Sequence, residues 1–434
     1  MKVLLLGLGR ANLAIAKYLL AKGDELYLYE EKPESLADTA KDMIRTGRIR
    51  NFEDRNYDLV ITSPGFPDSK AIINMLRARD MTIIDEIEFT YTHLNDPKVI
   101  AVTGTNGKST TVAIISSILT SAGVTNFLGG NISPGTPFSH SLFEEPYEYY
   151  ILEVSSFQLM RIKKFRPFIA VLTNIGIDHL NWHKSLNEYI EAKSRIFLNQ
   201  DRNDYAVLNS EDENTKKIAN MVPSKSVYFG RLAKNGAWLN GYFHFQHEEI
   251  FAGSGLPVTG EHNLLNILAA IAVSKILNIN NKSIEQGIRD FKSLPHRLED
   301  LGIIGGVHYI NNSMCTNEMA AITSFKAVKG NKIIIAGGRP KGDRALKYLD
   351  LLIMEAKACV LMGDNAQDIA QYFTNKGYSR YKVAKDMNDA IIKSRIFASP
   401  GDTIMLNPGF ASFGLFRDFA DRGDAFKNGI RKNR

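Results

Sequence analysis

The sequence predicts an α/β protein of three domains, and two observations carry this prediction. The first is length, because 434 residues correspond to roughly three domains of about 150 residues each. The second is that short apolar runs typical of buried strands alternate with stretches of helical periodicity along the chain. Helices that join parallel strands produce this alternation. With 44% hydrophobic and 10% aromatic residues, the composition is that of a globular protein and excludes intrinsic disorder.

The first predicted domain covers residues 1–93 and opens with an α/β unit of the nucleotide-binding kind. We expect strands at Lys2–Leu6, Glu25–Tyr29 and Leu59–Thr62, and a helix at residues 12–21. The turn Gly7-Leu8-Gly9-Arg10-Ala11-Asn12 has two of the three glycines of a dinucleotide-binding turn, and Glu30 lies about where an acidic ribose ligand would be expected. This turn either binds phosphate at the helix N-terminus or is a tight turn that binds nothing.

The second predicted domain covers residues 94–294 and begins where the polar Asn95-Asp96-Pro97 interrupts the pattern. A strand at residues 99–102 runs into a glycine-rich turn and a helix at 111–119, and further strands are expected at 150–154 and 169–173. Residues 203–260 predict irregular strands and loops, followed by a helix at 263–277.

The third predicted domain covers residues 295–434, after Leu294-Pro295. Strands at Lys332–Ala336, 358–362 and 402–406 alternate with helical stretches, which predicts a further α/β unit.

Composition also excludes several classes of protein. No apolar run approaches the roughly 18 residues that a membrane span needs, and the apolar start ends at Gly7, too early for a signal peptide. Cys315 and Cys359 are too few for a disulfide scaffold or a zinc site, so both are expected to be buried thiols in a reducing cytoplasm. A net charge of +6 without a dense basic tract favours anionic small substrates over nucleic acid.

The strongest local motif is Thr103-Gly104-Thr105-Asn106-Gly107-Lys108-Ser109-Thr110, between a predicted strand and a predicted helix. It predicts a phosphate loop, in which backbone N–H groups and the helix N-terminus hold polyphosphate oxygens. Lys108 adds charge near the β- and γ-phosphates, and the hydroxyl of Ser109 or Thr110 can bind Mg²⁺. The first glycine is closer to the Gly-Lys pair than in the standard spacing.

Two further side chains are placed where strand ends could present them to this loop. Glu153 ends the strand predicted at 150–154 and is either a Mg²⁺ ligand or a solvated strand-end acid. His179 follows the strand predicted at 169–173 and is either a ligand at the sheet edge or a structural histidine.

Lys193 interrupts the apolar face of the helix predicted at residues 185–197, for which Ser185 is a plausible N-cap. Its stem either carries the charge outward to water or is held inward with a depressed pKa for a chemical task. A neutral amine in that position could take up CO₂ and become a carbamate, which would convert a cation into a Mg²⁺ ligand.

These residues resemble the Mur ligases, the family of ATP-dependent amide ligases that build peptidoglycan precursors. The resemblance spans essentially the whole chain. Its motifs are Gly104-Thr105-Asn106-Gly107-Lys108-Ser109-Thr110, Gly129-Gly130-Asn131-Ile132, Glu153-Val154-Ser155-Ser156-Phe157-Gln158-Leu159, Asp178-His179-Leu180, Ala192-Lys193-Ser194-Arg195-Ile196, Gly260-Glu261-His262-Asn263-Leu264-Leu265-Asn266, Leu294-Pro295-His296-Arg297-Leu298-Glu299, Ala411-Ser412-Phe413 and Asp421-Arg422-Gly423.

The resemblance implies an N-terminal Rossmann-like UDP-binding domain, a central P-loop ATPase domain and a C-terminal Rossmann-like domain that brings the incoming amino acid. The implied reaction joins D-glutamate to UDP-N-acetylmuramoyl-L-alanine through an acyl phosphate, with ATP and two Mg²⁺ ions. We expect a monomer in the cytoplasm that acts on small molecules and binds neither nucleic acid nor membrane.

The resemblance also implies roles for individual residues. ATP would be held by the phosphate loop together with Asn263, Asn266, Arg297 and Asn312. One Mg²⁺ would bind Ser109 and Glu153, and the second His179 and a carbamylated Lys193. The UDP-linked substrate would contact Ser63, Asn131 and His179, and the amino acid would contact Thr316 and Lys341 through its α-carboxylate and Ser412 and the Phe419 backbone through its γ-carboxylate.

Several positions depart from the family pattern. Asn312 replaces an acid expected at the ATP ribose, and Met314 replaces a lysine near the phosphates. Arg10-Ala11, Asn181 and Gly414 also differ from the residues usual at their positions. Two alternatives therefore stay open: a diverged Mur-type ligase with another amino acid or acceptor, and a protein that binds nucleotide and UDP-sugar without turnover. A dehydrogenase is disfavoured, because it explains neither the phosphate loop nor the third domain.

Overall fold

The computed structural model describes residues 1–31, 33, 36–132, 135–176, 182–257, 260–292, 294–340 and 344–432. Contacts between residues divide the chain into two compact units. The first, here the N-terminal unit, comprises residues 1–255 and 265–291, and the second, here the C-terminal unit, comprises residues 256–264 and 292–434. The described strands form three sheets.

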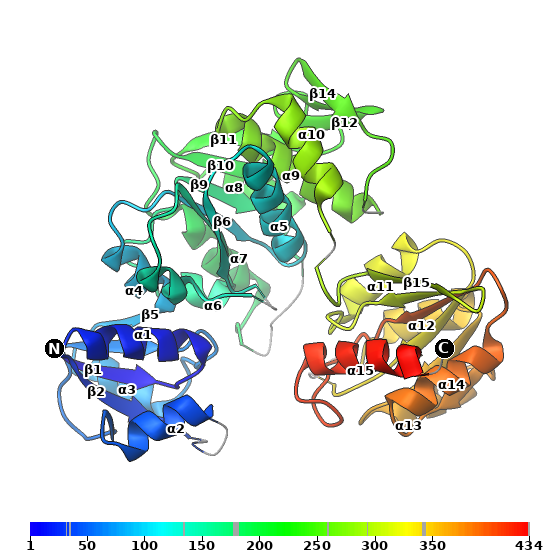
Figure 1. Ribbon diagram of the computed structural model, residues 1–434, viewed down its shortest axis with the longest axis horizontal. Coiled ribbons are helices and arrows are strands. Elements are labelled where there is room, and N and C mark those ends of the chain that lie inside the picture. The colour runs from blue at the N-terminus through cyan, green and yellow to red at the C-terminus, as the bar shows by residue number, and fades with distance from the viewer. Residues whose placement is uncertain are drawn as a thin grey trace. The chain divides into compact units, whose positions relative to one another are not determined.

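The first sheet of the N-terminal unit has five parallel strands in the order β3-β2-β1-β4-β5. Alternate residues of β1 enter two separate cores, Val3 and Leu5 on one face and Leu4 and Leu6 on the other, so helices cover both faces (Figure 1). The elements are β1 (Lys2–Leu6), α1 (Arg10–Ala21), β2 (Glu25–Tyr29), α2 (Asp38–Arg45), β3 (Ile49–Asn51), β4 (Leu59–Thr62), α3 (Ala71–Ala78), β5 (Ile83–Asp85) and α4 (Glu86–His93).

The second sheet of this unit has nine strands in the order β14-β13-β12-β11-β10-β9-β6-β8-β7. Pairs from β7 to β12 are parallel, and β12, β13 and β14 form an antiparallel extension at one edge. The elements are β6 (Val99–Thr103), α5 (Lys108–Ser121), β7 (Asn126–Gly130), η2 (Phe138–Phe143), β8 (Tyr149–Glu153), α6 (Ser156–Leu159), β9 (Ile169–Leu172), α7 (Leu186–Ser194), η3 (Arg195–Phe197), β10 (Tyr205–Asn209), α8 (Glu213–Ala219), β11 (Lys225–Phe229), β12 (Ala237–Asn240), β13 (Tyr242–Phe245), β14 (Glu248–Ala252), α9 (Glu261–Ile276) and α10 (Asn281–Asp290).

Helices α5 and α10 pack closely beside this sheet (Figure 1). A Cβ on Gly287 of α10 would lie 2.4 Å from Cα of Ile118 in α5, so the crossing requires a glycine. The Ser117 hydroxyl donates a hydrogen bond to the Gly287 carbonyl at 2.7 Å. This packing fixes α5, the helix that follows the phosphate loop.

The C-terminal unit contains a six-stranded sheet in the order β15-β16-β20-β17-β18-β19, parallel except for the β15–β16 hairpin. Apolar residues of α14 and α15 form one core, and those of α11, α12 and α13 form another, so the sheet lies between two helical layers (Figure 1). The elements are β15 (Glu299–Ile304), β16 (Val307–Asn311), α11 (Glu318–Ala327), β17 (Lys332–Ala336), α12 (Leu346–Glu355), β18 (Ala358–Leu361), α13 (Ala366–Asn375), β19 (Tyr381–Val383), α14 (Met387–Phe397), β20 (Thr403–Leu406) and α15 (Phe419–Lys432).

The predicted α/β class is confirmed, and β1, β2, β4 and β17 have the predicted bounds. The helices predicted at 12–21 and 111–119 begin earlier, at Arg10 and Lys108, because each glycine turn leads directly into helix. Residues 203–260 are more regular than predicted, since they contain five strands of one sheet and a helix. Each sheet draws its strands from one predicted domain, and the boundaries at residues 94 and 295 stay a prediction.

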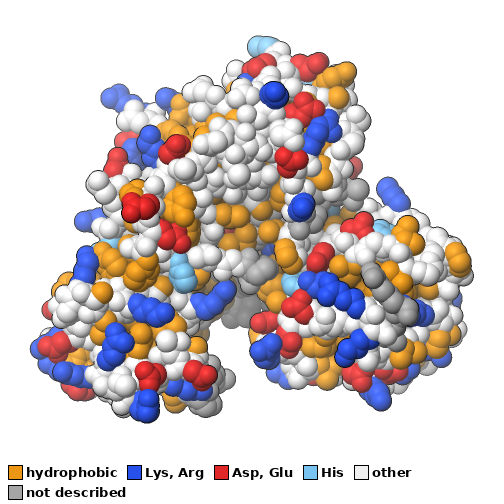
Figure 2. All heavy atoms as spheres, in the orientation of Figure 1, with side chains coloured by type: hydrophobic (Ala, Val, Ile, Leu, Met, Phe, Trp, Pro, Cys, Tyr) orange, Lys and Arg blue, Asp and Glu red, His pale blue; other side chains and the backbone are white. Residues whose placement is uncertain are grey.

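Two expectations about the surface and the thiols can be compared with the structure. Among the described residues, no helix is both long and apolar enough to span a bilayer. Cys315 and Cys359 are buried free thiols, as predicted, and burial raises the pKa of each to about 12. Figure 2 shows acidic and basic side chains interspersed over the visible face, without one dominant charged tract.

Candidate active site

The candidate active site lies at the carboxyl edge of three adjacent parallel strands, β9, β6 and β8. The phosphate loop, residues 104–107, joins β6 to α5, and Glu153 ends β8. Ligands of open α/β sheets bind at this edge, because the loops that follow parallel strands gather there. The fold thus brings together residues that are well separated in the sequence.

Two glycines give the phosphate loop its shape. Gly104 and Gly107 have φ angles of +150° and +86°, a region that disfavours side chains. A Cβ would lie 1.9 Å from Thr173 Oγ1 at Gly104 and 2.3 Å from Asn266 Oδ1 at Gly107. Thr173 and Asn266 therefore pack directly against the loop backbone, and the loop tolerates no larger residue at either position.

Hydrogen bonds from the chain after β9 hold the loop in place. The Thr173 hydroxyl and the Asn174 side-chain amide both donate to the Asn106 carbonyl, at 2.7 and 3.0 Å. Asn174 Oδ1 accepts from the Asn106 N–H at 3.0 Å. The loop is preorganised by a neighbouring strand end.

Lys108 begins α5 and turns back over the loop. Its ammonium donates to the carbonyls of Gly104 and Thr105, both at 3.0 Å. The charge therefore lies over the loop that the sequence assigns to polyphosphate.

Ser109 and Glu153 meet at the sheet edge. The Ser109 hydroxyl donates to Glu153 Oε2, and both side chains are buried. At 3% exposure, Glu153 is not the solvated strand-end acid that the sequence left open. A hydroxyl beside a carboxylate is a donor set that suits Mg²⁺, so these two residues fit a magnesium site.

Lys193 is held inward, so its stem does not carry the charge outward to water, and its chemical task stays a prediction. The side chain is 2% exposed, and its ammonium donates to the Gly104 carbonyl at 2.8 Å. It also lies 4.6 Å from the centre of the Tyr189 ring. The predicted N-cap is confirmed as well, because Ser185 accepts from the Glu188 N–H at 3.2 Å. Lys193 therefore reaches the phosphate loop from a helix that begins about 80 residues later in the chain.

Two predicted site residues, His179 and Lys341, lie outside the described residues, as does Asn181. A histidine that the sequence analysis did not single out, His183, is buried near Lys193. Its Nε2 is 2.9 Å from the Ser156 hydroxyl, and burial lowers its pKa. The hint in the sequence was its place two residues before the N-cap of α7.

Asn266 reaches the phosphate loop from α9. Its side-chain oxygen accepts from the Thr111 hydroxyl, in the first turn of α5, at 3.3 Å. Asn263, three residues earlier on the same helix, is also buried. Asn266, which the sequence predicts to contact the nucleotide, thus lies beside the phosphate loop.

The predicted UDP-substrate residues lie at two strand ends of the N-terminal unit. Ser63 follows β4 and donates to the Leu6 carbonyl at 3.1 Å, beside the first glycine turn. At the same turn, Glu30 accepts from the Leu8 N–H at 3.3 Å. Asn131 follows β7, and its N–H donates to the Glu153 carbonyl at 2.8 Å.

Arg161 was missed by the sequence analysis and links the two sheets of the N-terminal unit. Its guanidinium donates to the Thr62 hydroxyl at 2.8 Å, the Phe66 carbonyl at 2.6 Å and Asp68 at 2.5 Å. These partners flank Ser63 in the chain. Only the packing of the two sheets reveals the contact, because nothing near Arg161 in the sequence marks it.

Asn312, predicted at the nucleotide, makes internal hydrogen bonds in the C-terminal unit. Its amide donates to Asn407 Oδ1 at 2.8 Å, and its oxygen accepts from the Leu298 N–H at 3.1 Å. Met314 and Thr316 are partly buried in the following turn, which leads to the α11 N-cap Asn317. Arg297 is partly buried in the turn just before β15.

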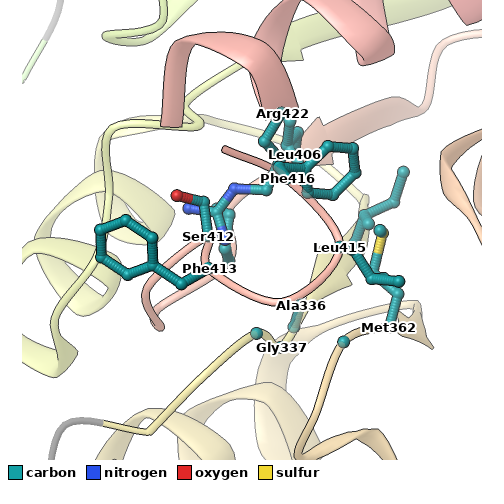
Figure 3. Close-up of a pocket in the computed structure, with 13 residues that line it drawn as sticks. Ala336, Gly337, Met362, Leu406, Ser412, Phe413, Leu415, Phe416 and Arg422 are labelled. Atoms are coloured by element: carbon teal, nitrogen blue, oxygen red, sulfur yellow. The ribbon is translucent and has the colours of Figure 1, made fainter. Parts of the chain in front are cut away.

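Ser412 lines a pocket within the C-terminal unit (Figure 3). The pocket is largely apolar, and Arg422 also lines it. Phe419, the first residue of α15, accepts a hydrogen bond from the Ser313 hydroxyl at 2.7 Å through its carbonyl. The lining residues are Ile335, Ala336, Gly337, Gly338, Met362, Gly363, Leu406, Pro408, Ser412, Phe413, Leu415, Phe416 and Arg422.

Comparison with protein families shows that residues 102–274 match the Mur ligase middle domain. A protein of Pelotomaculum thermopropionicum, named UDP-N-acetylmuramoylalanine--D-glutamate ligase, is 34% identical over 98% of this chain and 96% of its own length. The protein of that name from Clostridioides difficile is 32% identical over 99% and 98%.

Solved structures are similar in fold. UDP-N-acetylmuramate-alanine ligase MurC from Thermotoga maritima superposes with a TM-score of 0.62 over the whole of both chains, at 19% identity. MurF ligase from the same organism, in complex with ADP, has a TM-score of 0.62 and 16% identity over 94% of this chain and 99% of that one.

Proposed function

This chain belongs to the Mur ligase family, and on this premise we propose that it joins D-glutamate to UDP-N-acetylmuramoyl-L-alanine in an ATP-dependent reaction. One observation carries the proposal: Lys108, Lys193 and the hydrogen-bonded pair Ser109 and Glu153 all lie at the same edge of the sheet, around the phosphate loop. Relatives that are 32–34% identical over nearly their full length support D-glutamate as the incoming amino acid.

The first step brings two anions together, because the substrate carboxylate attacks the γ-phosphate of ATP. Lys108 and the N-terminus of α5, which begins where the loop ends, would offset this repulsion. Ser109 and Glu153 would hold Mg²⁺, which supplies additional positive charge at the phosphates when bound. The product is an acyl phosphate and ADP.

In the second step, the amine of D-glutamate attacks the carbonyl carbon of the acyl phosphate. The tetrahedral intermediate collapses with loss of inorganic phosphate, and the amine loses a proton as the amide forms. Ser412 and the Phe419 backbone would hold the γ-carboxylate of the amino acid, while Thr316 and Lys341 would hold its α-carboxylate.

We further assign Lys193 as a carbamate, formed when the neutral amine adds CO₂ and releases one proton. Burial supports this assignment, since removal from water favours the neutral form of the amine, and the nitrogen of a carbamate keeps an N–H that can donate to the Gly104 carbonyl. With His179, the carbamate would bind a second Mg²⁺. The three-domain division at residues 94 and 295 and a monomeric state complete the proposal.

The test is phosphate release by the purified protein with ATP, Mg²⁺ and UDP-N-acetylmuramoyl-L-alanine. D-glutamate is compared with L-glutamate, D-lysine and no amino acid. Release that depends on D-glutamate supports the proposal. Release with a different amino acid would keep the chemistry and change the substrate, and no release with any would contradict a ligase.

A further inference from the structure

Arg422 is a buried cation with neutral partners only, in the part of the C-terminal unit that the structure describes. The side chain is 2% exposed. Nε donates to the Ser313 hydroxyl at 3.0 Å, Nη1 to the Phe410 carbonyl at 3.1 Å and Nη2 to the Ser313 carbonyl at 2.8 Å. Among the described residues, no carboxylate forms an ion pair with it.

The other deeply buried arginine of the described chain shows what is unusual here. Arg161 is 5% exposed at its side chain and pairs with the Asp68 carboxylate at 2.5 Å. Burying a charge without a counter-charge is strongly unfavourable, and burial lowers the pKa of Arg422 to about 10. The Arg422 guanidinium in the pocket wall can therefore bind the anionic group of a ligand that enters the pocket.

The pocket and the hydrogen bonds of Arg422 connect this charge to the predicted amino-acid subsite. Ser412 and Arg422 line the same pocket (Figure 3). Arg422 bonds to Phe410, two residues before Ser412, and to Ser313, whose hydroxyl donates to the Phe419 carbonyl at 2.7 Å. One guanidinium therefore supports both groups assigned to the γ-carboxylate.

The N–H groups of Arg422 that its three hydrogen bonds do not use also suit a carboxylate. A guanidinium has five N–H groups, and the three hydrogen bonds above use one on each nitrogen. The rest of the pocket wall is apolar or backbone, with no second charged side chain among its lining residues. A neutral side chain entering this pocket would leave the charge of Arg422 uncompensated.

We propose that Arg422 is a positioning residue that sets the specificity of this pocket for an incoming amino acid with an anionic side chain. The inference rests on the proposed function and deepens it. Arg422 acts through Ser313, Phe410 and the Phe419 backbone, and its charge favours a carboxylate over an isosteric amide.

The experiment compares D-glutamate with its neutral isostere D-glutamine, with phosphate release as the readout. The quantity measured is the ratio of kcat/KM for the two amino acids. We expect Arg422→Gln to lower this ratio by about tenfold or more, through a higher KM for D-glutamate. The KM values for ATP and the UDP-linked substrate should change by less than about twofold. A purely structural role would lower kcat/KM for both amino acids equally.

Two further variants keep the test decisive. Arg422→Lys retains the charge, so it should keep the ratio within about threefold even though it loses hydrogen bonds. If the glutamine variant does not fold, Arg422→Met, which removes the charge and keeps a long side chain, replaces it, with the same loss of the ratio expected. Arg395→Gln, on α14 of the same unit, removes a hydrogen bond to Tyr309 at 2.8 Å and should leave the ratio unchanged.

The outcomes separate the two proposals. No D-glutamate-dependent release by the unmodified protein would contradict the proposed function. Release by the unmodified protein, together with an unchanged ratio in Arg422→Gln or a lost ratio in Arg422→Lys, would overturn this inference and leave the function standing.

Discussion

Lys193 combines burial with a place at the candidate active site, because its side-chain nitrogen lies inside the protein at the phosphate loop. If it acts as a carbamate, Lys193→Ala should lower ligation by about a hundredfold or more, and a small carboxylic acid in the buffer should restore part of it. Lys193→Arg should be inactive too, since a guanidinium cannot become an anion. Phosphate release measures this, with the exposed Lys184→Ala as the control. Full activity of Lys193→Ala would reject the carbamate.

Asn312 shows how a departure from the family pattern is accommodated by its neighbours. An aspartate there would keep the bond from the Leu298 N–H but lose the donor to Asn407. Asn407 cannot turn without losing its own bond to the Ala321 carbonyl at 3.0 Å. Asn312→Asp should therefore lower the free energy of unfolding by about 1–3 kcal/mol at pH 7, and less at low pH, where a protonated carboxyl can donate. Urea unfolding at both pH values measures it, and an unchanged stability at pH 7 would show that the network can rearrange.

Helix α4 places a buried acid at its first residue, where it joins α4 to η2. Glu86 accepts from the Ser139 N–H at 2.5 Å, and burial raises its pKa to about 7. Because the folded pKa exceeds the unfolded value of 4.5, the folded state binds more protons between these values. Stability should thus fall as pH rises from about 4.5 to 7, by on the order of 3 kcal/mol.

The variant Glu86→Gln isolates this contribution, because glutamine resembles the protonated acid. As the pH rises from about 4.5 to 7, the unfolding free energy of Glu86→Gln should increasingly exceed that of the unmodified protein. The neighbouring Asp85 also has a raised pKa, through burial and through the charge of Glu86, so the difference reports the interaction of this pair as well as the burial of Glu86. A difference that does not change with pH would mean that Glu86 is not buried as a neutral acid.

At the scale of the whole molecule, nucleotide binding should raise thermal stability. Ligand at 100 times its Kd adds about 2.7 kcal/mol to the folded state, which shifts Tm by a few degrees. With a non-hydrolysable ATP analogue and Mg²⁺, we expect this shift in the unmodified protein and its loss in Lys108→Ala. Lys282→Ala, an exposed lysine on α10, should keep the shift. Equal shifts in all three proteins would place the nucleotide elsewhere.

Much of the architecture and part of the site could be predicted from residue order. Strand and helix periodicity depends on near neighbours, so β1, β2, β4 and β17 were predicted with correct bounds. The phosphate loop was predictable for the same reason, since glycines, lysine and hydroxyls stand in one short segment.

Contacts between distant segments needed the folded chain. Ser109 and Glu153 are 44 positions apart, Lys193 and Gly104 are 89 apart, and Arg422 and Ser313 are 109 apart. The order of β9, β6 and β8 in the sheet brings the first two pairs together, and periodicity carries no information about that order. Arg161 was not singled out, and Arg422 stood in a family motif without a role of its own, because arginine is usually exposed. Only packing shows which arginines are buried and whether an acid accompanies them. A motif such as the phosphate loop can be recognised from neighbouring residues. The electrostatic character of a site depends instead on which distant groups share its low-dielectric surroundings.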